Sequence, residues 1–248
     1  MIEVEALMVF YENMIALNNV TMKCEDRQVV GVFGANSAGK STLMSALSGV
    51  LLDVAHKERM KGGERISLFG RILFNGRPVQ EQKAHERARK GIILCPERRR
   101  LFAESSVLEN LRIGGYLATR QQALSTLEYV LELFPPLTKH LKRPAGFLSG
   151  GEQQMVAVGR ALMAQPKVLL LDEPLLGLSP AIQHDLVKSI PVIREQRKIS
   201  VIVTEQYARP VMPYVDYAYI VENGSTVLEG TRDELLENPD VKSAYFGY

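Results

Sequence analysis

A loop near the amino terminus carries residue types that bind phosphate. It reads Gly34-Ala35-Asn36-Ser37-Ala38-Gly39-Lys40-Ser41-Thr42 and contains the pattern G-x-x-x-x-G-K-[ST]. The backbone N–H groups of such a loop, with the N-terminus of the helix that follows, can surround phosphate oxygens. Lys40 adds a point charge for the β- and γ-phosphates, and Ser41 is placed to coordinate Mg²⁺. The other interpretation is a glycine-rich turn without a ligand.

A pair of carboxylates, Asp172-Glu173, follows the apolar run Val168-Leu169-Leu170-Leu171. This run predicts a buried strand, so Asp172 is expected at its carboxyl end, where the ligand crevices of α/β sheets lie. There it would orient Mg²⁺ through water. The alternative is an ordinary strand that ends in acidic residues.

A second candidate anion site lies at Ser149-Gly150-Gly151, inside the run Leu148-Ser149-Gly150-Gly151-Glu152-Gln153-Gln154. A helix is predicted to follow it, so its amide groups and the helix dipole would attract negative charge. A single nucleotide does not need two such sites. The ligand of the second site therefore needs a separate explanation.

Strands and helices alternate around these motifs. Val29 to Phe33 reads as a strand and Lys40 to Gly49 as a helix, which is the order that a phosphate-binding loop needs. Further strands are predicted at Val168 to Leu171 and at Ile199 to Thr204, with a helix at about Pro180 to Arg197 between them. This alternation predicts a parallel α/β sheet.

An antiparallel layer is predicted beside this sheet. Its strands, bounded by turn residues, are expected at Ile2 to Phe10, Ile15 to Met22 and Gly70 to Gly76. Near the end of the chain, Asn223-Gly224 marks a hairpin between Tyr217 to Val221 and Thr226 to Leu228. Thr231-Arg232-Asp233-Glu234 then has the spacing of a capping box, which predicts the start of a helix.

Length and composition fit one core with an inserted helical subdomain. The chain has 248 residues, of which 46% are hydrophobic, and it can bury one substantial core. Apolar residues at three- and four-residue spacings from Ser106 to Leu141, interrupted at Pro135-Pro136, predict the helical insert. A further helix is expected from the Ser149 motif to about Ala164.

Charge and cysteine usage exclude several classes of protein. The 30 Lys and Arg residues against 28 Asp and Glu give a net charge of +2, too small for a dedicated nucleic-acid binder. A solvated loop is favoured over a nucleic-acid patch for Arg98-Arg99-Arg100.

Cys24 and Cys95 lack metal-site spacing and are expected to be buried or idle thiols. No apolar stretch approaches the ~20 residues that a membrane-spanning helix requires. Glu3 and Glu5 make the N-terminus acidic, whereas a signal peptide has a basic N-terminal region, so a cytosolic chain is expected.

The order of the three motifs resembles the ATP-binding cassette (ABC) family of ATPases. The resemblance covers essentially the whole chain and implies an α/β fold of the P-loop NTPase class. That fold has a RecA-like parallel sheet core, an antiparallel β layer and an inserted α-helical subdomain. As a single ABC ATPase domain, residues 1–248 would divide into a core at 1–95 and 165–230, a helical subdomain at 96–164, and a C-terminal helix and tail at 231–248.

The resemblance also implies ATP and Mg²⁺ as cofactors and assigns roles to residues. Thr42 would contact the α-phosphate, Lys40 would be catalytic, and Glu173 would orient and polarise the attacking water. Tyr11 occupies the place of the aromatic residue that stacks on adenine; an ordinary surface or core tyrosine is the alternative. Ser37 stands where the family usually has Gly, which is expected to crowd the loop or strain its backbone and to weaken nucleotide affinity.

In ABC ATPases the Ser149 motif acts across a head-to-tail dimer. By resemblance, Ser149 and Gly151 would cap the γ-phosphate held by the opposite subunit, so that two nucleotides are enclosed at one interface. The second subunit would be identical or homologous. Leu178-Ser179-Pro180 corresponds to the loop that crosses between the two sites.

Glu97 and Gln206 narrow the subfamily. Glu97 stands where many relatives carry Gln in the loop that meets the membrane partner, and it joins Ser41 and Asp172 as a candidate for the metal site. Gln206 replaces a switch histidine; its amide cannot shuttle protons but can donate a hydrogen bond to the γ-phosphate. Both residues resemble the second ATPase of branched-chain amino acid importers, and the related urea and amide importers share most of these features.

The resemblance therefore implies an ATP-hydrolysing, energy-coupling subunit. It would act on membrane permease subunits at the inner face of the cell membrane, serve a solute-binding protein indirectly, and bind no nucleic acid. One alternative is a soluble ABC ATPase that acts on nucleic acid or ribosomes, against which the lack of a long coiled-coil insertion or second cassette argues. Another is a regulator without turnover, which Ser37 and Gln206 favour and Glu173 opposes.

Overall fold

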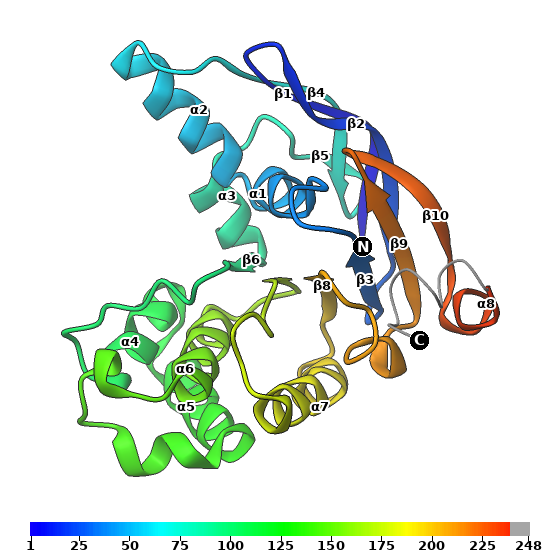
Figure 1. Ribbon diagram of the computed structural model, residues 1–248. Helices are drawn as coiled ribbons and strands as arrows, with labels where there is room; N and C mark the ends of the chain where they lie inside the picture. The colour runs from blue at the N-terminus through cyan, green and yellow to red at the C-terminus, as the bar shows by residue number, and fades with distance from the viewer. Residues whose placement is uncertain (239–248) are drawn as a thin grey trace.

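Two sheets organise the computed structural model, which describes residues 1–238 (Figure 1). The larger sheet has the order β10-β9-β3-β8-β7-β6, in which the strands from β9 to β6 run parallel and β10 pairs antiparallel with β9. The smaller sheet is antiparallel, with the order β2-β1-β4-β5. The strands are β1 (Ile2–Tyr11), β2 (Met14–Cys24), β3 (Val29–Phe33), β4 (Ile66–Phe74), β5 (Arg77–Pro78), β6 (Ile92–Cys95), β7 (Val168–Asp172), β8 (Ser200–Glu205), β9 (Tyr217–Glu222) and β10 (Ser225–Thr231). The predicted α/β fold with a parallel sheet and an antiparallel layer is confirmed.

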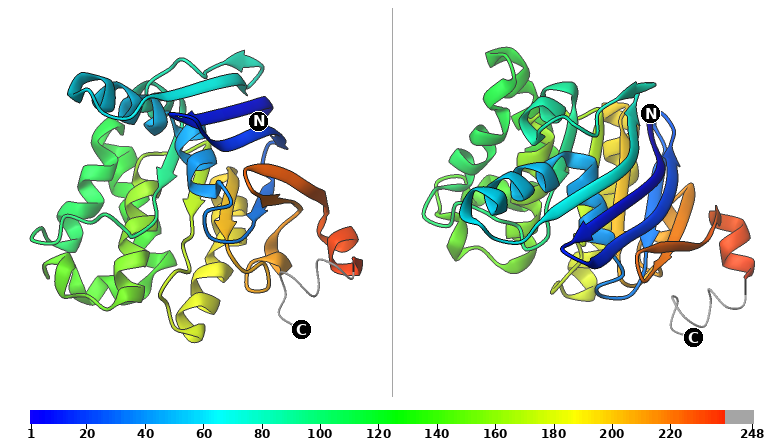
Figure 2. Two further views of the ribbon diagram at one scale, coloured as in Figure 1. Left: turned by 45° about the horizontal axis from the view of Figure 1, so that its top comes forward. Right: turned by 90° about the horizontal axis from the view of Figure 1, so that it is seen from above.

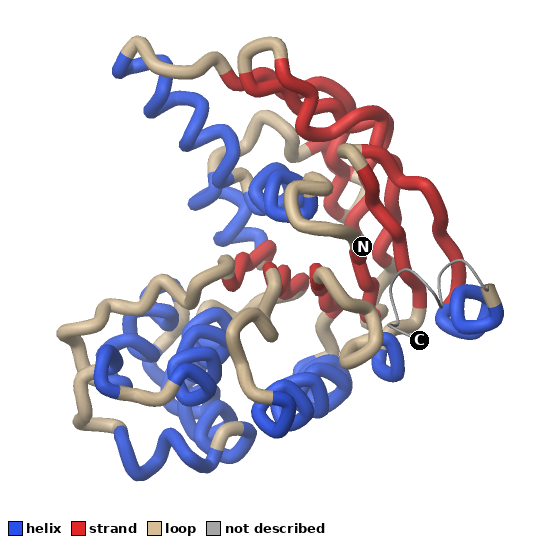
Figure 3. Tube along the Cα trace, in the orientation of Figure 1, coloured by secondary structure: helices blue, strands red, loops and turns tan. Residues whose placement is uncertain are grey.

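Helices separate the two sheets and cover the free face of the larger one (Figure 2). The helices are α1 (Lys40–Ser48), α2 (Val50–Lys61), α3 (Ala84–Lys90), α4 (Val107–Gly114), α5 (Arg120–Leu133), α6 (Gly150–Met163), α7 (Pro180–Arg197) and α8 (Arg232–Glu237), with short 3₁₀ helices η1 (Gly115–Leu117), η2 (Pro135–His140), η3 (Ala145–Phe147) and η4 (Met212–Tyr214). Strands gather at one side of the molecule and α4 to α6 at the other (Figure 3).

The central strands are buried on both faces, as parallel strands usually are. Every residue of β3, β7 and β8 is buried. In β3, Val30 and Val32 pack with α1 and the antiparallel sheet, whereas Val29 and Phe33 pack with α6 and α7. The period of two along a strand therefore divides the apolar side chains between two hydrophobic cores.

The predicted helical insert is divided into shorter elements. The pattern from Ser106 to Leu141 corresponds to α4, η1, α5 and η2, and α5 ends at Leu133, just before the two prolines. These helices pack closely on α6: a Cβ added at Gly159 would lie 2.7 Å from Val130. Only a residue without a side chain fits at this contact.

Two helices, α2 and α3, were not predicted from the sequence. In α2 only Leu51 is buried, and the helix projects from the upper left of Figure 1. Helix α3 is held instead by Arg87, which is fully buried and donates to the carbonyl oxygens of Leu47, Gln80 and Gln82. Neither helix has the broad apolar stripe that periodicity detects.

The hairpin and the last helix follow their local signals. Asn223 and Gly224 have φ values of 49° and 78°, as a two-residue hairpin turn of this kind requires. Thr231 accepts a hydrogen bond from the Glu234 N–H at the start of α8, which confirms the capping box. The remainder of the predicted C-terminal tail, 239–248, lies outside the described residues.

The two cysteines are buried, in agreement with the sequence-based expectation. Desolvation raises the pKa of the Cys24 thiol, and likewise that of the Cys95 thiol, to about 12. Within 1–238, no helix combines the length and the hydrophobicity needed to cross a membrane.

Candidate functional site

The predicted phosphate loop connects β3 to α1. Gly39 has a φ of 107°, and a Cβ there would lie 2.7 Å from the Ala16 carbonyl oxygen. A Cβ at Gly34 would lie 2.2 Å from the carbonyl oxygen of Val221. The loop is thus pressed against β2 and β9 at two points that only glycine tolerates, which fixes its position relative to the sheet.

Ser37 has a φ of 66°, in the left-handed region. A residue with a Cβ is disfavoured there by roughly 1–2 kcal/mol. The backbone strain expected from a serine at this position is therefore present in the loop. The predicted weakening of nucleotide affinity follows from this strain and stays a prediction.

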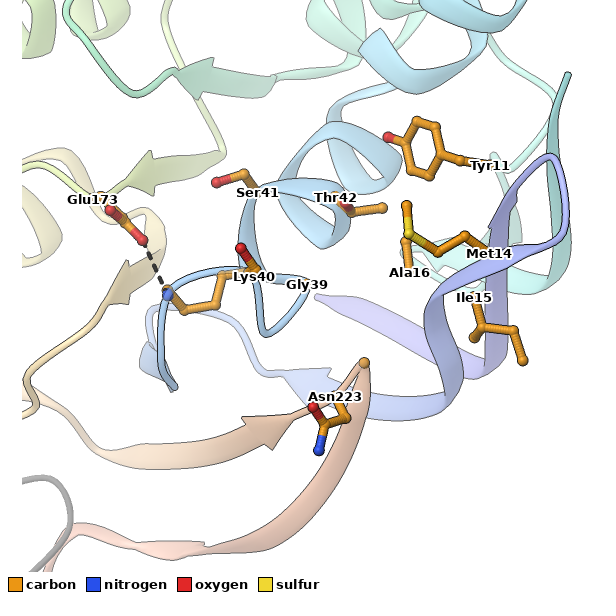
Figure 4. A pocket seen from close by; sticks show the side chains of 12 residues that line it. Tyr11, Met14, Ile15, Ala16, Gly39, Lys40, Ser41, Thr42, Glu173 and Asn223 are labelled. Atoms are coloured by element: carbon orange, nitrogen blue, oxygen red, sulfur yellow. Dashed lines mark ion pairs between the residues drawn. The ribbon is translucent and has the colours of Figure 1, made fainter. Parts of the chain in front are cut away.

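A cavity of about 490 Å³ opens beside the loop (Figure 4). Its volume lies in the range of small-molecule sites. The lining residues come from four parts of the fold, and they are Tyr11, Met14, Ile15, Ala16, Ser37, Gly39, Lys40, Ser41, Thr42, Glu173, Asn223 and Gly224. Tyr11 and Met14 lie at one end and Lys40 and Glu173 at the other (Figure 4). The cavity is therefore aromatic and apolar at one end and charged at the other.

Lys40 is almost completely buried and has three acceptors. Its Nζ donates to the carbonyl oxygens of Gly34 at 2.8 Å and Ala35 at 2.9 Å, and lies 3.0 Å from Glu173 Oε1. Glu173 itself has a φ of 44°, a strained value for a residue other than glycine. A phosphate that enters the loop would compete with Glu173 for the ammonium group of Lys40.

Oxygen donors converge at the carboxyl ends of β7 and β8. Ser41 Oγ donates to Asp172 Oδ1 at 3.1 Å, and Thr204 Oγ1 donates to the same oxygen at 2.9 Å. Burial raises the pKa of Asp172, while these two hydrogen bonds oppose the shift. A hydroxyl and a carboxylate suit Mg²⁺, which usually keeps waters and takes further oxygens from phosphates. Within 1–238, no group of three or more His, Cys, Asp or Glu side chains could hold a metal ion. A bound Mg²⁺ would therefore need oxygens from water and phosphate in addition to Ser41 and Asp172.

Glu205 belongs to this site, although the sequence analysis did not name it. Its side chain is 7% exposed, and its Oε1 accepts a hydrogen bond from the Leu175 N–H at 2.8 Å. Burial raises the pKa of Glu205 to about 8, and the nearby charge of Glu173 contributes to the shift. The signal in the sequence was a carboxylate that follows the apolar run 201–203 after one residue, Thr204, which pairs with Asp172 at the same sheet edge.

The other predicted site residues lie apart from the cavity. Within 1–238, its walls do not include Glu97, Gln206 or the motif at 149–151. Glu97 Oε1 lies 3.1 Å from Arg98 Nε, and Gln206 is partly buried beside Glu205. Asp172 also lies outside the walls but contacts Ser41, which lines them. The structure thus unites the loop, Tyr11 and Glu173 and leaves the Ser149 motif elsewhere.

The Ser149 motif begins α6, as predicted. Ser149 is exposed; its Oγ accepts a hydrogen bond from the Glu152 N–H and donates to Glu152 Oε2 at 2.8 Å. The other carboxylate oxygen of Glu152 lies 3.2 Å from His140 Nε2. A capped helix of 14 residues, with its N-terminus at the surface, can attract an anion brought by another molecule.

Comparison with known proteins gives consistent matches along the chain. Residues 17–176 match the protein family described as ABC transporter. The chain is 37% identical to the high-affinity branched-chain amino acid transport ATP-binding protein BraG of Pseudomonas aeruginosa, over 100% of both chains. It is 31% identical to the probable branched-chain amino acid transport ATP-binding protein LivF of Archaeoglobus fulgidus, over 96% of this chain and 94% of that protein. A crystal structure of an ATP-binding cassette of an ABC transporter, in its ADP conformation, has a TM-score of 0.81 and 26% identity and covers 100% of this chain and 98% of that one.

Proposed function

Because the chain belongs to the ABC transporter family, we propose that it is the ATP-hydrolysing, energy-coupling subunit of an importer for branched-chain amino acids. The full-length similarity to BraG and LivF supports the solute class. The observation that best supports ATP hydrolysis is the cavity beside the phosphate loop, in which Lys40 and Glu173 form an ion pair. Urea or amide import is the alternative role for the same ATPase.

Each part of ATP has a matching surface in the cavity. The adenine lies against Tyr11 and Met14, whose ring and thioether provide apolar contact area (Figure 4). The phosphates lie against Lys40 and the backbone N–H groups of 34–42, and Thr42 contacts the α-phosphate.

The charged end of the cavity supports hydrolysis of the terminal phosphate. Ser41, Asp172 and Glu97 would hold Mg²⁺, and the ion would stabilise negative charge on the phosphate oxygens. Once phosphate engages Lys40, the Glu173 carboxylate is released from its ion pair and orients the attacking water. Gln206 donates a hydrogen bond to the γ-phosphate but takes no proton.

A second ATPase subunit, identical or homologous, completes the site. The Ser149 motif of one subunit faces the γ-phosphate bound by the other in a head-to-tail dimer that encloses two nucleotides. The exposed, capped N-terminus of α6, away from the cavity of its own chain, supports this arrangement. Gln183 Nε2 donates to the carbonyl oxygens of Leu175 and Leu178 and so holds the loop that crosses between the two sites.

Permease subunits are the membrane partners, and they place the chain at the inner face of the membrane. Exposed apolar side chains within 102–117, which follow Glu97 in the sequence, support a docking surface for them; these are Phe102, Ile113, Tyr116 and Leu117. A solute-binding protein acts on the chain only through the permease.

Mg²⁺-dependent ATP hydrolysis by the purified chain tests this function. Turnover should rise more than linearly with protein concentration, because the active species is a dimer. Glu173→Gln should lower kcat by about 10²- to 10⁴-fold, since it removes the residue that activates water, and should leave ATP binding intact. Binding without turnover in the parent chain, even with permease present, would instead support a regulatory subunit.

A further inference from the structure

A second cavity, of about 410 Å³, lies at the end of the larger sheet opposite the phosphate loop. Its lining includes residues that come just before three parallel strands: Arg27 before β3, Lys167 before β7 and Lys198 before β8. The nucleotide cavity instead takes residues from the loops that follow β3 and β7. Within 1–238 the two cavities share no lining residue, so the second is a separate candidate site.

Positive charge prevails in the lining of the second cavity. Four of its residues have cationic side chains, and these are Arg27, Lys167, Arg197 and Lys198. Asp26 is the one carboxylate among the described lining residues, and its Oδ1 lies 2.6 Å from the amino nitrogen of Met1. Lys167 and Lys198 form no ion pair with any residue in 1–238. A hollow lined by charges of one sign concentrates ions of the other sign, so this cavity should attract anions.

The backbone of Arg27 is tied to the start of β8. The Arg27 N–H donates to Ser200 Oγ at 2.9 Å, and this hydroxyl donates to the carbonyl oxygen of Glu25 at 2.8 Å. Ser200 is buried, and it lies two residues after Lys198. The turns that present Arg27 and Lys198 are therefore held side by side without a ligand.

The guanidinium of Arg197 is also held in place. Its Nη2 donates to Thr126 Oγ1 at 3.2 Å and to Gln165 Oε1 at 2.9 Å. The guanidinium carbon lies 5.1 Å from the centre of the Tyr129 ring, within the range of a cation–π contact. Because this side chain is already ordered, a ligand that binds beside it loses less free energy to ordering.

The number of cations and the size of the cavity indicate the class of ligand. A phosphate group has up to two negative charges and three strong acceptor oxygens, so it can be bound by cations from several turns at once. A carboxylate has a single charge and two oxygens. The cavity also has the volume of sites that bind whole organic molecules, roughly 300–1,000 Å³. A phosphorylated small molecule therefore fits better than a single inorganic anion.

We propose that the second cavity binds a small organic molecule with two or more phosphate groups. Arg27, Lys167 and Lys198 bind the phosphate oxygens, and the ordered guanidinium of Arg197 adds positive charge. The bound molecule connects the turns before β3, β7 and β8, at the ends of the strands that lie away from the nucleotide. This inference does not rest on the proposed function, since the site forms within one chain and needs no ATP.

Isothermal titration calorimetry of the full chain tests the site. The probe is fructose 1,6-bisphosphate, and the chain has the Lys40→Ala substitution, which weakens phosphate binding at the nucleotide cavity. One molecule should bind per chain, and the affinity should fall as salt is added, because salt screens exposed charges. Absence of binding at low salt would overturn the proposal.

A pair of charge-matched double variants locates the binding. Lys167→Gln with Lys198→Gln should weaken binding of the probe by about 5- to 25-fold, since each exposed ion pair contributes up to about fivefold. Lys57→Gln with Lys61→Gln, at exposed positions of α2, removes the same charge outside the cavity and should leave the affinity unchanged. Equal weakening by both double variants would show general attraction to the protein surface and would overturn the site.

Two further measurements keep the test decisive. Arg27→Gln should also weaken binding, and it serves alone if the first double variant does not fold, because the contact with Ser200 is made by the backbone N–H. Citrate, which has three carboxylates, should bind more weakly than fructose 1,6-bisphosphate. Citrate binding of equal strength would overturn the assignment of the site to phosphate groups. Neither measurement involves ATP hydrolysis, so failure here leaves the proposed function standing.

Discussion

The two anion-binding regions of the chain are built in opposite ways. The phosphate loop places a nearly buried lysine beside Glu173 and is fixed by glycine contacts with β2 and β9. The Ser149 motif is exposed, and its hydroxyl is used to cap its own helix. The loop, Lys40 and Glu173 of the first region therefore all come from one chain, whereas the second region presents a helix N-terminus that can attract an anion held by another molecule. Mutations should separate binding by the first region from assembly through the second.

Removal of the Lys40 charge should give the largest effect. Lys40→Ala leaves Glu173 without its buried partner and the phosphates without their nearest cation, so ATP affinity should fall by at least about 10²-fold. Equilibrium binding of ATP to the monomeric chain measures this change. Unchanged affinity would show that the loop backbone alone binds the phosphates.

A charge of the wrong sign at the second region should affect turnover and leave binding intact. Ser149→Asp keeps a side chain that can cap α6 but places a carboxylate where the γ-phosphate of the other subunit is expected. Turnover should fall by about 10- to 100-fold, because like charges in such an interface are strongly unfavourable. ATP affinity of the monomer should stay at the parental value. Loss of ATP binding by the monomer would contradict the assignment of nucleotide binding to the first region and of assembly to the second.

The buried carboxyl of Glu205 should make stability depend on pH. Its pKa is raised from 4.5 to about 8, so the folded state holds a proton that the unfolded state has released between these values. The contribution to the free energy of unfolding is fully present below pH 4.5 and is lost as pH rises through 8. Denaturant titrations from pH 5 to 9 should show this decline, and Glu205→Gln should flatten it. Glu104→Gln, at an exposed position, should not.

The smallest expected effect concerns strain in the phosphate loop. Ser37→Gly should relieve a left-handed backbone and raise the free energy of unfolding by about 1 kcal/mol. Calorimetry should then show a Tm higher by roughly 2–4 °C, as expected for a chain of this size. Nucleotide affinity should also rise. An unchanged or lower Tm would show that the Ser37 side chain contributes stabilising contacts.

Local signals were sufficient for much of the fold and the site. The loop at Gly34, the strand before Asp172 and the hairpin at Asn223 each depend on residues adjacent in sequence, and the structure has all three. Helices α2 and α3 were missed because few of their side chains enter the core, and α3 depends on a buried Arg87 whose acceptors lie elsewhere in the chain. Glu205 was missed for a related reason: its importance comes from burial and from Leu175, 30 residues away.

The burial of both native thiols makes this chain suitable for distance measurements. A thiol must ionise to react with common labelling reagents, and a pKa of about 12 leaves Cys24 and Cys95 almost entirely un-ionised at neutral pH. Cysteines introduced at exposed positions can therefore carry a pair of fluorophores without prior removal of the native ones. With one label on α2 and the other on α5, energy transfer would follow the relative motion of the sheet side and the helical side of the molecule as ATP binds.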